Sequence, residues 1–297
     1  METQPNTVTK RMTSMPSTVA WMAWGLMVLL LTATGCQTNP YTGRWQLMMV
    51  PMSQEVQMGV QAYAEVQHDP KMKPSTDPRE IDPVKRVAAR VIAAAKHSKY
   101  SDIANQFEWE VTVIKDDKTM NAFALPGGKI AVYTGIFPVA KTEAGLAAVM
   151  GHEVVHALAR HGGERMSQNT LAQTTLQVIG VALGVSGANP ALSQAGMAAL
   201  GVGAQVGVLL PFSRKHESEA DYVGVLLAAE AGYDPRESIR LWTRMGELSG
   251  GKEPSEFMST HPNHETRIQQ LEEWMAEAMP IYESKPPAPN GELPLLR

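Results

Sequence analysis

The chain has 297 residues, of which 44% are hydrophobic and 19% are charged, and its formal net charge is −4. This composition is that of a globular protein, so it excludes an intrinsically disordered chain, and the length allows one large domain or two small ones. The sequence has no cluster of Lys and Arg interleaved with aromatic residues, so we expect no nucleic-acid partner. Because Cys36 is the single cysteine, no disulfide framework can support the fold.

The N-terminus has the layout of a secretory signal peptide. Lys10 and Arg11 precede an apolar run over residues 19–31, which is too short for a comfortable transmembrane helix. Small residues then lead to Cys36, as in a bacterial lipobox, although Ala33 stands where that pattern usually has Leu. The run therefore predicts export from the cytoplasm.

Residues 1–35 are interpreted as a lipoprotein signal peptide, which would leave Cys36 as the lipidated first residue of the mature protein. Ordinary secretion with a free thiol is the alternative. Gln37 rather than Asp follows the cysteine, and by resemblance to lipoprotein sorting in Gram-negative bacteria this implies the periplasmic face of the outer membrane. The expected membrane contact is thus a lipid anchor at Cys36.

Local patterns predict two helices and a strand before residue 115. The proline-rich residues 68–83 separate the helices, and alternating apolar and polar residues mark the strand. The helices are expected from Ser53 to about Val66 and from Val84 to His97, and the strand over Phe107–Ile114.

Two further strands are expected in Asn121–Phe137, on either side of Pro126-Gly127-Gly128. An edge strand beside a cleft can bind an extended peptide by adding it to the sheet, so that backbone hydrogen bonds supply affinity without sequence specificity. The alternative is a purely structural hairpin.

Residues 142–161 are expected to form one helix that carries two histidines and a glutamate. His152 and His156 are four residues apart, so they share a helix face and can bind one metal ion. Glu153 lies about 100° further round the helix, where it can deprotonate the water that attacks a substrate. This H-E-x-x-H pattern is typical of zinc hydrolases. An exposed polar turn is the less favoured interpretation, because the small apolar run before the pattern predicts a buried helix.

The stretch after this helix is the hardest to place. Helical patterning resumes over residues 164–181, and residues 183–210 form an apolar tract rich in Gly and Ala. The second half of the tract approaches membrane-spanning length, but Gln194, Gln205 and several glycines weaken that case. A water-soluble helical hairpin is therefore favoured over insertion in a bilayer.

A second helix, expected over residues 213–231, supplies carboxylates. Glu217 and Asp221 are four residues apart and share a face. A catalytic zinc ion held by two imidazoles needs a third protein ligand, which Glu217 can provide. Asp221 is placed to hold the distal N–H of a ligand histidine. Glu219 points elsewhere on the helix and is expected at the surface.

These motifs together resemble a known family. The segments GHEVVHALARHGGER, FSRKHESEADYVGVLLAAEAGYDP and STHPNHETRI are similar to those of zinc endopeptidases of the CAAX prenyl protease and HtpX type, metallopeptidase family forty-eight. The lipobox followed by NPYTGRWQLMMV resembles their periplasmic lipoprotein branch. The resemblance implies one zinc ion per chain held by His152, His156 and Glu217, with Glu153 as general base and Asp221 behind the ligands.

The resemblance also implies roles for residues near the C-terminus and in the strand pair. His261, or else Arg267 at the start of a helix running to about Met279, would stabilise the oxyanion. In related proteins this histidine can instead reach the metal and hold the enzyme latent, and the sequence does not choose between these roles. The substrate-binding edge strand would comprise Asn121, Ala122, Phe123 and Ala124.

The expected fold class is α+β and mostly α. A gluzincin-type H-E-x-x-H metalloprotease domain would span residues 36–283, with a small β-sheet whose edge strand flanks the zinc helix. The Pro-rich residues 284–297 are expected to be a disordered tail.

The expected function is zinc-dependent cleavage of unfolded, misfolded or misassembled cell-envelope proteins, with the outer-membrane assembly machinery as a candidate partner. Two alternatives stay open. One is a lipoprotein chaperone or assembly factor with a structural or latent zinc site, which a closed fourth ligand would favour. The other is an inner-membrane quality-control protease with residues 175–210 in the bilayer. The substrate, any regulator and the oligomeric state do not follow from the sequence.

Overall fold

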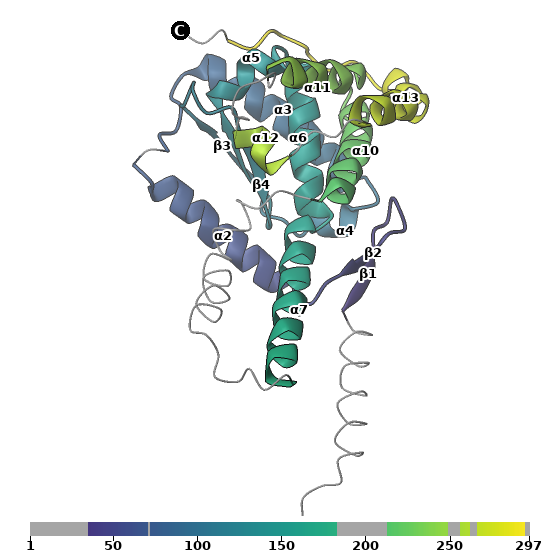
Figure 1. The fold of residues 1–297 in the computed structure, drawn as a ribbon. Helices are drawn as coiled ribbons and strands as arrows, with labels where there is room; N and C mark the ends of the chain where they lie inside the picture. Colours follow the sequence, from purple (N-terminus) through teal and green to yellow (C-terminus); the bar gives the residue numbers. More distant parts are fainter. Residues whose placement is uncertain (1–34, 71, 183–212, 249–255, 262–265, 295–297) are drawn as a thin grey trace, which may run out of the picture.

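The computed structural model describes residues 35–70, 72–182, 213–248, 256–261 and 266–294. In Figure 1 several helices surround one central helix, and a small sheet lies on one side of it. The expected α+β, mostly helical fold class is confirmed. The tract of residues 183–210, for which a helical hairpin is expected, lies outside the described residues.

The central helix is α6 (Glu143–Leu158), and all of its residues are buried. Helix α10 (Arg214–Glu230) packs along it. Their backbones approach closely at Gly151 and Gly224, since a Cβ on Gly151 would lie 2.7 Å from the carbonyl oxygen of Gly224. The absence of side chains at this crossing therefore allows the two helices that carry the predicted zinc ligands to meet at backbone contact.

A three-stranded sheet with the order β3-β5-β4 packs beside α6. Strands β4 (Ala122–Leu125) and β5 (Lys129–Tyr133) form the predicted antiparallel hairpin, with Ala122 opposite Val132. Strand β3 (Glu110–Ile114) pairs with β5 in parallel. Within the described residues β4 therefore has a strand on one side only, and this edge strand contacts α6.

Two helices before the sheet differ at their ends from the sequence expectation. Helix α2 (Met52–His68) has Pro51 as its N-cap instead of Ser53. Helix α3 (Pro78–Lys96) begins at Pro78, well before the expected Val84. A proline at the first helical position lacks only an N–H that has no partner within the helix, so it starts this helix rather than breaking it.

The single helix expected over residues 142–161 is two helices. Helix α6 gives way to α7 (His161–Ala182) after Arg160, whose φ of 56° is in the left-handed region. This conformation costs a non-glycine residue about 1–2 kcal/mol. The Arg160 guanidinium is held by the carboxylate of Glu55, with Nη2 and Oε1 2.5 Å apart in a buried pair. The buried ion pair between Arg160 and Glu55 thus holds the turn that ends α6.

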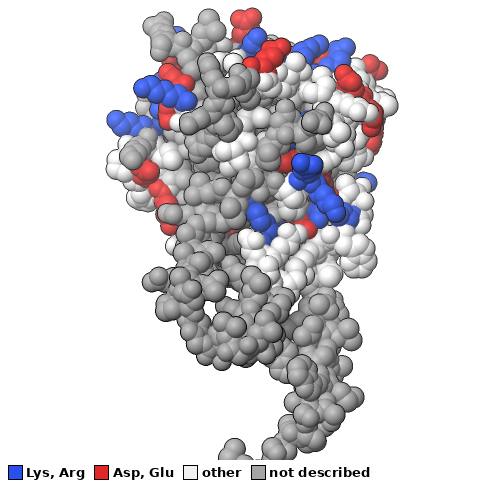
Figure 2. Space-filling view, viewed as in Figure 1, with Lys and Arg blue, Asp and Glu red and all other residues white. Residues whose placement is uncertain are grey.

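The remaining elements frame this core. The β1–β2 hairpin contacts α7, α11 packs against α6, and α13 packs against α10 and α11. Acidic and basic side chains are interspersed on the described part of the face in Figure 2. Among the described residues, no helix combines the length and apolarity needed to cross a bilayer. The bounds are β1 (Cys36–Thr38), β2 (Trp45–Leu47), α4 (Ser101–Ala104), η1 (Thr134–Ile136), α5 (Phe137–Ala140), α11 (Arg236–Leu248), α12 (Glu256–Thr260) and α13 (Arg267–Glu283).

The Pro-rich C-terminal tail, expected to be disordered, is docked on the domain over residues 285–294. Leu293 is buried, and its N–H donates to the carbonyl oxygen of Lys141. The side-chain oxygen of Asn290 accepts a hydrogen bond from the backbone N–H of Ala144. The tail therefore satisfies a first-turn N–H of α6 that has no partner within the helix. The expectation of disorder is wrong for these residues, because composition does not register a docking site elsewhere in the chain.

Candidate metal centre

Four side chains from three segments converge on one point. Helix α6 contributes His152 and His156, α10 contributes Glu217, and His261 directly follows α12. Each offers one ligand atom, and these atoms all lie within 4.8 Å of one another. All four residues are buried. The structure therefore brings the three predicted ligands together and adds His261 to them.

The spacing of these atoms suits a tetrahedral zinc ion. Ligand atoms about 2.05 Å from a tetrahedral zinc ion lie about 3.3 Å from one another. Nε2 of His152 lies 3.1 Å from Nε2 of His156 and 3.5 Å from Oε2 of Glu217. Nε2 of His156 lies 3.4 Å from Oε1 of Glu217. Two imidazoles and a carboxylate are also a known donor set of catalytic zinc sites, so the residues fit zinc in both geometry and chemistry.

Asp221 and Arg267 lie behind the ligands and orient them. Oδ1 of Asp221 lies 2.8 Å from Nδ1 of His152 and accepts its N–H, which leaves Nε2 of that ring with a lone pair for the metal. Arg267 donates through Nε to Oδ2 of Asp221 and through Nη2 to Oε2 of Glu217, both at 2.6 Å. It is fully buried, and its guanidinium carbon lies 3.5 Å from the ring centre of Trp242. Arg267 thus binds the two carboxylates through Nε and Nη2, while its buried Nη1 makes no hydrogen bond to the described residues, so the oxyanion role expected for Arg267 stays a prediction.

Glu153 lies beside the ligands without joining them. Its carboxylate lies beside the backbone N–H of Ala124 in β4, and its Oε1 lies 3.4 Å from Nε2 of His261. Burial raises the pKa of the Glu153 carboxyl above its ordinary value, while the nearby His261 and His152 lower it in part. A buried carboxyl with a raised pKa beside a metal site suits a general base.

The predicted substrate strand lies next to this carboxylate. Its first two residues, Asn121 and Ala122, are buried, and the next two, Phe123 and Ala124, are partly exposed. The backbone N–H of Phe257 in α12 donates to the carbonyl oxygen of the residue that precedes the strand. The edge strand, the general base and the segment that leads to the fourth histidine are therefore joined in one site.

His261 occupies the fourth position of the centre. Its Nδ1 lies 3.1 Å from Oε1 of Glu217 and 3.2 Å from Nε2 of His152. The ring stacks on Phe257, with ring centroids 4.6 Å apart. Of the two roles that the sequence leaves open for His261, this geometry favours the metal ligand over the oxyanion donor.

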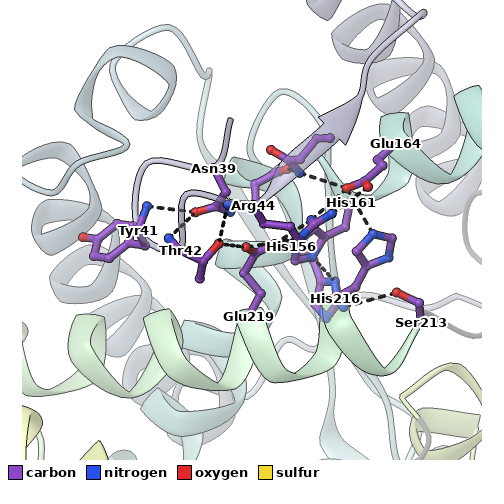
Figure 3. Close-up of polar contacts among 12 residues, drawn as sticks. Asn39, Tyr41, Thr42, Arg44, His156, His161, Glu164, Ser213, His216 and Glu219 are labelled. Atoms are coloured by element: carbon purple, nitrogen blue, oxygen red, sulfur yellow. Dashed lines mark hydrogen bonds and ion pairs between the residues drawn. The ribbon is translucent and has the colours of Figure 1, made fainter. Parts of the chain in front are cut away.

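A second polar cluster, the Arg44 cluster, lies behind the metal centre and was not expected from the sequence. Nη1 and Nη2 of Arg44 donate to the two carboxylate oxygens of Glu164, and Nη2 also lies 2.7 Å from Oε2 of Glu219. The rings of His161 and His216 stack with centroids 4.5 Å apart. Nε2 of His216 lies 3.1 Å from Glu164 Oε2. Figure 3 shows these side chains meeting from the β1–β2 turn, α7 and α10.

Glu219, expected at the surface, is buried in the Arg44 cluster. Burial alone would raise the pKa of its carboxyl, but hydrogen bonds from His161, Arg44 and Thr42 lower it to about 2. Its helix position does direct it away from the zinc ligands, but the β1–β2 turn and α7 cover that side of α10. No local spacing connects residues 44, 161 and 219, so no sequence pattern could have grouped them.

Known proteins are similar to this chain over the stretch that holds the metal centre. Residues 78–275 match peptidase family M48, and this stretch includes all the candidate zinc ligands. The chain is 40% identical to mitochondrial metalloendopeptidase OMA1 of Schizosaccharomyces pombe over 243 residues, which cover 80% of this chain and 66% of that protein. It is 29% identical to metalloendopeptidase OMA1 of Homo sapiens over 287 residues, which cover 92% of this chain and 53% of that protein.

A bacterial relative matches a shorter stretch. The β-barrel assembly-enhancing protease of Yersinia pestis is 32% identical over 152 residues, 50% of this chain and 31% of that protein. The chain therefore spans only part of the length of each of these relatives. The matches confirm the resemblance to family forty-eight without singling out its lipoprotein branch. Together with the converging ligands, they lead to the conclusion that this chain is a zinc metallopeptidase and belongs to peptidase family M48.

Proposed function

We propose that this protein is a zinc-dependent endopeptidase that cleaves misfolded or misassembled cell-envelope proteins. The lipid on Cys36 would hold it at the periplasmic face of the outer membrane. The substrate class, the compartment and the anchor go beyond the metallopeptidase class, and each has its own support.

One observation carries the catalytic part: a buried carboxylate lies between the zinc ligands and the edge of a sheet. Glu153 follows the ligand His152 directly in α6, and its carboxylate lies beside the backbone N–H of Ala124 in β4. A peptide added to β4 would gain backbone hydrogen bonds without a sequence preference, which suits unfolded substrates. Such a peptide would pass close to both the general base and the ligands.

Each group then has a defined task. A bound zinc ion supplies Lewis acidity to the scissile carbonyl and lowers the pKa of a water molecule. Glu153 takes a proton from the attacking water and passes it to the leaving amine. Asp221 and Arg267 keep His152 and Glu217 in the orientations that binding the ion requires.

His261 controls access to this centre. Catalytic zinc sites keep one position for water or substrate, whereas four protein donors close a site. Because Nδ1 of His261 lies among the ligand atoms, we interpret this arrangement as a latent state of the peptidase. A substrate carbonyl would then require His261 to leave the fourth position.

The same closed centre favours a second candidate function, a lipoprotein chaperone or assembly factor whose zinc is structural. The two functions make different demands on Glu153, because a structural site has no use for a general base. Substitution of this residue therefore separates them.

Replacing Glu153 with Gln tests the catalytic part. Glu153→Gln should still bind one zinc ion per chain by metal analysis and should lose casein hydrolysis and self-cleavage by about 100-fold or more. Unimpaired hydrolysis by this variant would exclude the mechanism. If neither the wild type nor His261→Ala, in which the fourth donor is removed, cleaves casein, the chaperone becomes the better explanation.

The position of Cys36 supports an anchor at this end of the domain. The residue is exposed and begins β1, close to the first of the described residues. The name of the Yersinia pestis relative refers to β-barrel assembly, which supports substrates or partners among β-barrel proteins and their assembly machinery. The Schizosaccharomyces pombe relative is named as mitochondrial. We do not transfer that compartment to this chain, because the lipobox-like sequence before Cys36 favours a bacterial cell envelope.

Membrane extraction of a Cys36→Ala variant tests the anchor. A protein held by lipid alone should move to the soluble fraction, while Glu153→Gln, which keeps the cysteine, should stay with the membrane. A Cys36→Ala protein that remains membrane-bound would instead support insertion through residues 175–210 and an inner-membrane location.

A further inference from the structure

The two ligand histidines of α6 are supported in different ways. His152 donates its Nδ1–H directly to Asp221. Nδ1 of His156 instead lies 3.0 Å from Nδ1 of His161, the first residue of α7. Nε2 of His161 lies 2.9 Å from Oε2 of Glu219. A third histidine is thus placed between the second ligand and its carboxylate.

If His156 binds a metal ion through Nε2, the hydrogen-bonded series His156–His161–Glu219 allows only one arrangement of protons. A carboxylate accepts hydrogen bonds, so Nε2 of His161 carries the hydrogen that Glu219 accepts. A neutral imidazole then has a lone pair on Nδ1, which accepts the Nδ1–H of His156. His156 is left with a lone pair on Nε2, the atom that faces Glu217. The carboxylate of Glu219 therefore selects the metal-binding tautomer of His156 through an intervening ring.

Glu219 is held in turn by the N-terminal hairpin. Arg44, between β1 and β2, donates to Glu219 through Nη2 at 2.7 Å and Nε at 3.2 Å, and the hydroxyl of Thr42 donates to the same carboxylate. Arg44 also binds Glu164, which fixes the first turns of α7. Figure 3 shows the series continuing from the hairpin to His156.

The break between α6 and α7 makes the contact between the two histidines possible. In an uninterrupted α-helix, side chains five residues apart point about 140° away from each other. Residues 156 and 161 have this spacing, yet their ring nitrogens lie 3.0 Å apart. The left-handed turn at Arg160, held by Glu55, redirects the chain so that His161 faces His156. A strained backbone position thus has an identifiable consequence at the metal centre.

We propose that His161, Glu219 and Arg44 are positioning residues of the zinc centre, and that the β1–β2 hairpin completes the active site. Arg44 lies outside residues 78–275, the part that matches family M48. Through the contact of Arg44 with Glu219, the hairpin would help to set the orientation of the ligand His156 and would not act only as a spacer. This inference rests on the zinc peptidase centre described under the proposed function.

Zinc affinity of the full chain tests the proposal, measured by competition with a chromogenic chelator after the metal has been removed. His161→Phe keeps a ring but loses both nitrogens, and we expect zinc binding to weaken by about 10- to 100-fold. His161→Asn restores an acceptor close to the position of Nδ1 and should recover most of that loss. Arg44→Ala, which is farther along the series, should lose less than His161→Phe.

Arg86→Ala provides the matched control. Arg86 pairs with the buried Glu143 at the other end of α6, with Nη2 and Oε1 2.7 Å apart, and its described contacts do not reach a zinc ligand. This variant should bind zinc like the wild type. Wild-type affinity in His161→Phe, or an equal loss in Arg86→Ala, would overturn the proposal.

A second variant covers the case in which His161→Phe does not fold. Glu219→Leu removes the terminal acceptor, is similar in size and leaves every group in contact with the metal unchanged. Circular dichroism of the metal-free proteins identifies the folded variants, and weaker zinc binding by Glu219→Leu supports the proposal while unchanged binding overturns it.

The readout also separates this inference from the proposed function, because zinc affinity is measured without a substrate. If the zinc affinities of the variants follow the expected order but the protein cleaves no peptide, the peptidase function fails. The inference that His161 and Glu219 position His156 then still stands. If the protein cleaves casein but all variants bind zinc equally, the peptidase function stands, and the proposed role of His161, Glu219 and Arg44 fails.

Discussion

Two clusters of histidine and glutamate lie next to each other in this protein, and only the zinc centre has converging ligand atoms among the described residues. The other is the Arg44 cluster of Figure 3. The difference lies in how the carboxylates are used. Arg44 binds both oxygens of Glu164 and also Glu219, whereas Arg267 binds Oε2 of Glu217 and leaves Oε1 facing the ring nitrogen of His156.

This difference shows that histidine and glutamate content does not define a metal site. The Arg44 guanidinium satisfies both buried carboxylates of its cluster with charge-assisted hydrogen bonds, so that cluster needs no metal ion. In the zinc centre Arg267 binds only Oε2 of Glu217, and a metal ion can satisfy the lone pairs of Oε1 and of the histidine nitrogens that converge beside it. The Arg44 cluster can then support the centre from behind.

Metal removal should have the largest effect on stability. Zinc at about 1,000 times its Kd stabilises the folded state by about 4 kcal/mol, or about 8–16 °C in Tm for a domain of this size. Thermal unfolding of the chelator-treated protein, with and without added zinc, measures the shift. His152→Ala should abolish it. A shift that survives in His152→Ala but disappears in His216→Ala would place the metal in the Arg44 cluster and reverse the comparison.

Neutralising one glutamate in each cluster should separate ligand from support. Glu217→Gln removes a ligand, so zinc affinity should fall by more than about 100-fold, beyond the loss that a supporting partner causes. Glu219→Gln should lose less than about 10-fold, because the amide oxygen can still accept from His161. Chelator competition measures both values. Equal losses of zinc affinity in the two variants would mean that Glu217 and Glu219 contribute equally to metal binding.

Removing the guanidinium of the Arg44 cluster should destabilise the protein even without metal. Arg44→Met removes the guanidinium that the buried carboxylates of Glu164 and Glu219 share, and we expect unfolding in urea to cost about 2 kcal/mol less, after allowance for the partial exposure of Arg44. Adding Glu164→Gln and Glu219→Gln should recover stability. Arg79→Met breaks only a surface pair and serves as the control. Equal stabilities of Arg44→Met and the wild type would show that the cluster contributes nothing.

The docked tail should matter least for the zinc centre. Leu293→Ala truncates a buried side chain and should cost about 2 kcal/mol in urea unfolding, the low end of the range for a buried leucine. The tail contacts the N-terminal end of α6, away from the ligands near its C-terminal end, so zinc affinity should stay the same. A loss of zinc affinity in Leu293→Ala would show that any loosening of α6 reaches the centre, which would weaken the interpretation of His161→Phe.

Much of the site could be expected from sequence because its parts are local. Positions four apart on a helix point to the same side, which places His152 with His156 and Glu217 with Asp221. The β4–β5 hairpin follows from a turn sequence between two apolar runs. The end of α6 could not be expected, because the turn at Arg160 is held by Glu55, more than a hundred residues earlier in the chain.

The amino-acid sequence by itself determined which side chains meet along one element: the histidine pair and base of α6, and the carboxylate pair of α10. Only the tertiary structure decided what surrounds them, including His261 in the fourth position, Arg267 behind the carboxylates and Arg44 in contact with Glu219. The physical reason is that helix periodicity sets directions over a few residues, whereas a buried polar group must find its partners wherever packing brings them. These partners lie on segments that no local spacing connects.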